Sequence, residues 1–252
     1  MKKRAFTLAE VLITLGIIGV VAALTMPSLI ANYKEKETVT RVKKVYSELS
    51  QAFLSAVNEN GTPDNWNLIA MDDPEGNANM AKPFLPYLRI MNDCGAQGEG
   101  CFSKDIYKRL NGLDSTGTVS SNPNAFYMIR LVSGTSVAFR VNNPNCTGIT
   151  TGIIGAEELY CGLIYVDTNG DAPPNTFGID FFTFYMGNNK IFPMGMQTDT
   201  RYPFSTRCNK ADTSDPSTSP NGFGCSAWVI TNENMDYLHC NDLSWTGKTT
   251  CK

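Results

Sequence analysis

The chain has 252 residues and a formal net charge of −3 at pH 7, which argues against a basic nucleic-acid-binding protein. Hydrophobic residues make up 42% and charged residues 18% of the chain, so its composition is not that of an intrinsically disordered protein. The length allows one or two domains with a sizeable core.

The chain begins with a basic leader and a long apolar segment. Three cations at positions 2–4 precede this segment, and Glu10 is its only charged residue before Lys34. Residues 11–30 would form a helix of about 30 Å, which matches the hydrocarbon core of a bilayer. Cations on the N-terminal flank predict that this end stays in the cytoplasm, so the chain beyond Lys34 is expected to be exported.

Glu10 is the informative residue of the apolar segment. An unpaired carboxylate in a bilayer costs roughly 2.5 kcal/mol or more and is usually functional. Glu10 is the last residue of the sequence AFTLAE at residues 5–10, in which a small residue precedes Phe-Thr-Leu-x-Glu. Over about the first fifty residues the chain resembles type IV pilins and type II secretion pseudopilins, which carry this class III signal. One position differs, because the family usually has glycine where this chain has Ala5.

The resemblance implies how the chain would be processed and assembled. A prepilin peptidase would cut between Ala5 and Phe6 and methylate the new amine of Phe6. In a filament, the Glu10 carboxylate would pair with the Phe6 amine of a neighbouring subunit. The residues implied for processing and assembly are Ala5, Phe6, Thr7, Leu8 and Glu10.

Partners and location follow from the same resemblance. The expected partners are other pilin subunits, the prepilin peptidase and the inner-membrane assembly platform, with no nucleic acid for a major subunit. Before assembly the chain would cross the bacterial inner membrane once, with its N-terminus in the cytoplasm. It would then enter a pilus or pseudopilus in the periplasm or at the cell surface.

Two other interpretations of the apolar segment stay open. Residues 21–23, Val-Ala-Ala, are acceptable to signal peptidase I and would give a secreted protein that begins at Leu24. Glu10 interrupts the boundary between the n-region and the h-region of such a signal. The segment could also be a plain single-pass anchor in which Glu10 has no role.

An amphipathic pattern continues beyond the apolar segment, from Tyr33 to about Val57. Apolar residues recur every three or four positions and charged residues lie between them, so one helix of about fifty residues is expected. Pro27 should bend this helix or remove one hydrogen bond, and Gly19 falls where pilins commonly have a glycine. The apolar stripe consists of Val39, Val42, Val45, Tyr46, Leu49, Ala52, Phe53, Ala56 and Val57.

The remaining chain predicts an antiparallel sheet after an irregular region. A short helix is expected over 79–91, and residues 226–238 suit either a helix or a strand. Two pairs of expected strands are joined by Gly-containing turns typical of hairpins. The strands are expected at 126–132, 135–141, 163–166, 180–186 and 190–194.

These elements define a fold class and four parts of the chain. The class is α+β, with a long N-terminal helix packed on an antiparallel β-sheet and a disulfide-bonded C-terminal region, in the order of parts of a pilin. The parts are a leader (1–5), a transmembrane half-helix (6–30), an amphipathic half-helix (31–60) and an exported globular domain (61–252).

Eight cysteines lie beyond the apolar segment, in the part expected to be exported. An even number in an exported domain predicts disulfides. The chain has no CxxC motif and one histidine, so a zinc cluster of the usual kind is not expected. Pairing between sequence neighbours is the simplest of the connectivities that remain open. That pairing is Cys94 with Cys101, Cys146 with Cys161, Cys208 with Cys225, and Cys240 with Cys251.

One loop resembles the first half of a calcium site. Asp167, Asn169 and Asp171 place oxygen ligands at alternate positions, and Asp180 could close the site from the next strand. Some pseudopilins carry a calcium-stabilised loop in this region. The alternative is a plain Asn-Gly turn without a metal. No other cofactor is expected, and no catalytic motif is complete, since His239 is the only histidine and GxSxG is absent.

Two functions therefore follow from the sequence. The first is a structural subunit of a type IV pilus or a type II secretion pseudopilus. The alternative is a minor tip pilin whose globular domain binds a surface, DNA or an exported substrate.

Overall fold

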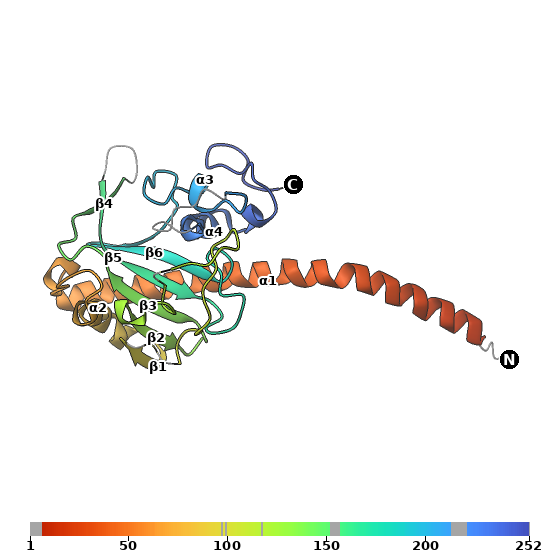
Figure 1. The fold of residues 1–252 in the computed structure, drawn as a ribbon, viewed down its shortest axis with the longest axis horizontal. Helices are drawn as coiled ribbons and strands as arrows, with labels where there is room; N and C mark the ends of the chain where they lie inside the picture. Colours follow the sequence, from red (N-terminus) through yellow and green to blue (C-terminus); the bar gives the residue numbers. More distant parts are fainter. Residues whose placement is uncertain are drawn as a thin grey trace. The chain divides into compact units, whose positions relative to one another are not determined.

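The computed structural model describes residues 7–96, 98, 100–116, 118–151, 157–212 and 221–251 (Figure 1). The chain forms two compact units, Met1–Glu37 and Thr38–Lys252. Each unit is described by itself below.

Helix α1 (Leu8–Asn60) is the longest element, and its end lies close to the predicted one. In the second unit its apolar stripe packs into the core, as the three- and four-residue spacing predicts. Tyr46 stacks on Phe184 with ring centroids 5.5 Å apart, and its hydroxyl donates to the Ile191 carbonyl at 3.2 Å. The buried members of the stripe are Val39, Val42, Val45, Leu49, Ala52, Phe53 and Ala56.

The described residues contain one antiparallel sheet of seven strands in the order β1-β2-β3-β5-β6-β7, with β4 paired to β5 outside this path. Figure 1 shows the second half of α1 lying along this sheet. The strands are β1 (Ile90–Gly95), β2 (Tyr127–Leu131), β3 (Ser136–Val141), β4 (Gly148–Thr151), β5 (Glu157–Asp167), β6 (Phe181–Gly187) and β7 (Ile191–Pro193).

The five predicted strands correspond to β2, β3, β5, β6 and β7, which confirms the antiparallel α+β class. The predicted helix over 79–91 is wrong in position. Helix α2 (Pro74–Ala81) begins earlier, because Asp73 caps it by accepting from the Gly76 N–H at 2.8 Å and Pro74 suits its first turn. A 3₁₀ helix (Lys82–Tyr87) and strand β1 follow.

The sheet is buried on both faces at its centre, around β3 and β6. Phe184 and Phe139 belong to the core that includes α1, whereas Tyr185 and Tyr165 belong to a second aromatic core on the opposite face. Side chains of neighbouring strand residues point to opposite faces, so this arrangement explains why every residue of β6 is buried.

The C-terminal region contains α3 (Phe204–Arg207) and α4 (Ser226–Asn232), so the undecided segment 226–238 begins as a helix. The buried Trp228 stacks on Phe204 with centroids 4.1 Å apart. Short 3₁₀ helices complete the fold at Pro63–Asn65, Pro123–Ala125, Phe223–Cys225 and Asp236–Leu238. The structure joins the cysteines as sequence neighbours: Cys94–Cys101, Cys146–Cys161, Cys208–Cys225 and Cys240–Cys251.

Candidate functional site

The start of α1 is closed by a reciprocal pair of hydrogen bonds between Thr7 and Glu10. The Thr7 N–H and hydroxyl donate to Glu10 Oε2 at 2.9 and 2.8 Å, and the Glu10 N–H donates to Thr7 Oγ1 at 3.3 Å. This is a capping box, in which the residue before the helix and the third helical residue satisfy each other's backbone N–H groups. Leu8 and Ala9, between them, form the first helical positions.

The capping box gives the Glu10 carboxylate hydrogen-bond partners within one chain, which the sequence-based argument did not name. Within one chain the carboxylate already accepts two hydrogen bonds from Thr7. The signal was present in the sequence, because Thr7-Leu8-Ala9-Glu10 fits the pattern Ser/Thr-x-x-Glu ahead of an apolar run. Ala5 and Phe6, the residues expected at the cleavage point, lie outside the described residues.

The first half of α1 has the length and apolar character of a membrane span. Helix α1 is the only such helix among the described residues. No residue of its most apolar stretch is buried within the chain. Its hydroxyl groups are satisfied along the helix itself: Thr14 donates to the Glu10 carbonyl, Thr25 to the Val21 carbonyl and Ser28 to the Thr25 carbonyl. A helix that satisfies its polar groups internally is suited to lipid.

Helix α1 continues through both Gly19 and Pro27, so neither residue ends it. Proline removes a single backbone donor, and flanking hydroxyls can bond to carbonyls near it. Thr25 and Ser28 provide such bonds on either side of Pro27. A Cβ atom added at Gly19 would meet no other atom within 4 Å.

The residues expected to bind calcium are partly brought together. The Asp167 carboxylate accepts from the Tyr107 hydroxyl at 2.7 Å and from the Asn169 N–H at 3.2 Å. Asp180 accepts from two backbone N–H groups, at residues 175 and 176. Asp171 instead pairs with Arg130, with Nη2 and Oδ1 3.0 Å apart. No group of three His, Cys, Asp or Glu residues is arranged to hold a metal within the part of the chain that is described.

Burial makes the charged forms of this acidic pair unfavourable. Asp167 and Asp180 are 0% and 3% exposed. Desolvation, followed by the nearby charge of Asp180, raises the pKa of Asp167 well above its usual range. Desolvation also raises the pKa of Asp180, although backbone N–H donors oppose the shift. The two carboxyl groups therefore hold protons more tightly in the folded state than in the unfolded chain.

In EDTA, the contribution of this acidic pair to the stability of the fold is expected to fall as pH rises from about 4 toward neutrality. A carboxyl group with a raised pKa stabilises the fold below its unfolded pKa of about 3.9, and the contribution is lost through the folded pKa. Asp167→Asn mimics the protonated group, so this variant should keep the contribution of position 167 at every pH. Melting curves of the wild type minus those of Asp167→Asn isolate the effect from other carboxylates. Asp171→Asn is the matched control, and an equal pH difference in that variant would contradict the prediction.

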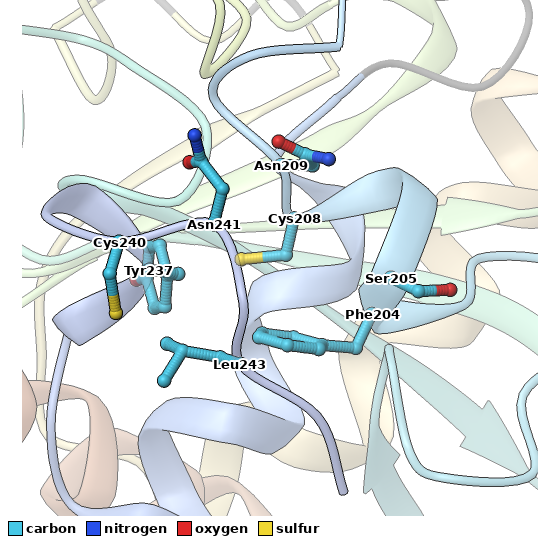
Figure 2. Close-up of a pocket in the computed structure, with 8 residues that line it drawn as sticks. All are labelled: Phe204, Ser205, Cys208, Asn209, Tyr237, Cys240, Asn241 and Leu243. Carbon is cyan, nitrogen blue, oxygen red and sulfur yellow. The ribbon is translucent and has the colours of Figure 1, made fainter. Parts of the chain in front are cut away.

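The C-terminal region contains a small pocket, shown in Figure 2. Its cavity volume is about 20 Å³, which is room for about one water molecule rather than a cofactor. Cys208 and Cys240 both border it but belong to different disulfides. The pocket is lined by Phe204, Ser205, Cys208, Asn209, Tyr237, Cys240, Asn241 and Leu243.

Comparison with known proteins gives two matches. A model described as a family of unknown function (DUF6613) matches residues 28–231, which is most of the chain. A model of the prokaryotic N-terminal methylation motif matches residues 1–26, so the chain carries the class III signal of type IV pilins and pseudopilins. No curated protein and no solved structure matches the chain.

Proposed function

Because this chain belongs to the DUF6613 family of unknown function and carries a methylation motif, we propose that it is a filament subunit of a type IV pilus or a type II secretion pseudopilus. The motif indicates a pilin-like subunit that is processed by prepilin peptidase. The motif also favours a structural role over an enzymatic one.

The observation that carries this proposal is the start of α1. An exposed apolar helix and the methylation motif occupy the same residues, so this surface is available first to lipid and then to other subunits. In the proposed mechanism the cations at positions 2–4 keep the N-terminus in the cytoplasm, where the leader is removed. The subunit then waits in the inner membrane until its helix packs into the filament.

Glu10 has two roles in this mechanism. In the single subunit it caps α1 through Thr7, which lowers the penalty of carrying a carboxylate into the membrane. In the filament it pairs with the Phe6 amine of a neighbour. Because that pair forms at only one offset between helices, it favours a single register of docking.

Mass spectrometry of the mature protein is expected to show a chain that starts at N-methylated Phe6. In cells without prepilin peptidase, the same protein should keep residues 1–5. A mature chain that starts at Leu24 would contradict the proposal and indicate cleavage by signal peptidase I.

A minor subunit at the filament tip is the second candidate, with a globular domain that binds a surface, DNA or an exported substrate. The large size of the part after residue 60 favours this role modestly. Immunogold labelling separates the two candidates, because a major subunit would be labelled along the shaft and a minor one at tips.

We also propose that calcium binds beside Asp167, Asn169 and Asp180. The buried Asn169 Oδ1 has no hydrogen-bond partner among the described residues, and hard cations take carboxylate and amide oxygens. Asp171 would have to leave Arg130 to join them. Calcium would neutralise the charge that burial disfavours.

Replacing EDTA by calcium at about 100 times its Kd should stabilise the fold by about 2.7 kcal/mol. For a domain of this size, the melting temperature should rise by roughly 5–10 °C. Magnesium at the same concentration is the control ion. An unchanged melting temperature at millimolar calcium would contradict calcium binding.

A further inference from the structure

An open groove lies beside the end of α1, between the segment after the helix and α2. Its cavity volume is about 480 Å³, within the range of roughly 300–1,000 Å³ that small-molecule sites occupy. Four of its eight lining residues are asparagines. The lining residues are Asn60, Asn65, Trp66, Asn67, Glu75, Asn79, Lys82 and Pro83.

Three of these amides are held in place by hydrogen bonds through their NH₂ groups. Asn60 donates to the Ala56 carbonyl at 3.0 Å, and Asn79 donates to the Asn67 carbonyl at 3.0 Å. Asn65 donates to Thr62 Oγ1 at 3.3 Å. Each therefore retains an amide oxygen as an acceptor for a ligand's hydroxyl group.

Asn67 provides a fourth amide, and Trp66, which is 7% exposed, provides a small apolar surface. The exposed Asn67 side chain makes no hydrogen bond to any residue that the structure describes, and its backbone is left-handed, with φ of 55°. The Trp66 N–H is already used by the Gly61 carbonyl at 2.9 Å, and its ring packs against Phe53 and Phe84. The indole therefore offers only apolar contact to the groove.

The walls of the groove are fixed by the core. A Cβ atom at Gly76, in α2, would lie 2.3 Å from the Leu68 carbonyl oxygen, so α2 is pressed against the segment that carries Trp66 and Asn67. The buried Asn77 accepts from the Val141 N–H at 2.7 Å and ties α2 to β3. A groove whose backbone is held in place by such contacts loses less conformational entropy on ligand binding than one built on a loop without them.

We infer that this groove binds a neutral carbohydrate. Sugars present many hydroxyl groups that pair with amides, and their C–H groups suit the small exposed part of the Trp66 indole. The one cation, Lys82, is balanced by the one carboxylate, Glu75, so the groove has no charge preference for an anionic ligand. A single carboxylate also makes it a poor metal site. The inference does not depend on assembly into a filament.

The test uses the full chain in a detergent without a sugar headgroup. The probes are maltotriose, mannotriose and triacetylchitotriose, with 3′-sialyllactose as the anionic comparison. Binding is measured by saturation-transfer NMR and by calorimetric titration. At least one neutral trisaccharide should bind more tightly than sialyllactose.

Two variants and a control locate the site. Asn67→Gly keeps the left-handed backbone and removes only the amide, and Asn65→Ala removes a second amide. Each should weaken binding by about 10-fold, the value of one or two lost hydrogen bonds, without lowering the melting temperature. Asn189→Ala, at an exposed asparagine outside the groove, should bind as the wild type does.

Three results would overturn the inference. The first is no binding of any neutral probe, and the second is binding of sialyllactose alone. The third is neutral-sugar binding that Asn67→Gly and Asn65→Ala leave unchanged. If Asn67→Gly alters self-association in sedimentation while no sugar binds, the groove is a contact between copies of the chain and the inference is also overturned.

Discussion

A chain with Glu10→Ala is expected to reach the membrane and fold, but to stay out of filaments. Removing one partner of a buried ion pair leaves the other charge unpaired, at a penalty of about 3–5 kcal/mol. Incorporation should therefore fall by more than about 100-fold. The measurement is the ratio of this chain in sheared filaments to that in membranes, by immunoblot.

Two further substitutions separate the charge of Glu10 from its capping role. Glu10→Gln keeps an oxygen that can accept from Thr7 but lacks the charge, so it should also fail to assemble. Thr14→Ala is the matched control, because Thr14 bonds only to carbonyls of its own helix. If Glu10→Gln enters filaments as the wild type does, capping rather than charge pairing is the role of this residue.

Phe53→Ala is expected to lower the free energy of unfolding by about 3–5 kcal/mol, as for other buried phenylalanines. Phe53 is fully buried where α1 meets the core, with ring centroids 6.2 Å from Trp66 and 6.0 Å from Phe84. Its loss leaves a cavity between the helix and the elements that follow it. Denaturant unfolding of the full chain in detergent, followed by tryptophan fluorescence, measures the change.

Leu54→Ala is the matched control for Phe53→Ala. Leu54 is the next residue of the same helix but is 61% exposed, so its substitution should change stability by no more than about 0.5 kcal/mol. Equal losses in the two variants would contradict the packing of the predicted stripe against the core.

The parts of the fold that could be predicted are those with strong apolar periodicity. The α1 stripe repeats every three or four residues, and β6 is a run of large apolar side chains buried on both faces. Strand β1 lacks such a signal, because half of its residues are exposed at the sheet edge and its register to β2 is irregular. Helix α2 lacks it as well, since only Met80 and Ala81 of PEGNANMA bring apolar side chains into the core, beside the cap and the Asn77 hydrogen bond.

The methylation motif could be predicted from the sequence, whereas the groove beside α2 could not. The residues from Ala5 to Glu10 are contiguous in the sequence, so the methylation motif could be found without a structure. The capping box was also present there as Thr-x-x-Glu. The asparagine-lined groove depends on the packing of α2 against the segment after α1. No local sequence pattern specifies this tertiary contact.

The connectivity of the cysteines has a mechanical consequence. Each disulfide closes a loop between neighbouring cysteines, and all four lie between Cys94 and Cys251. None of these four disulfides therefore joins α1 to the sheet. If a filament under tension transmits load through its N-terminal helices, the pull on each subunit is resisted by the packing of side chains such as Phe53 and Tyr46. The helix could then peel away under force and return when the load is removed, while the disulfide-closed loops stay intact.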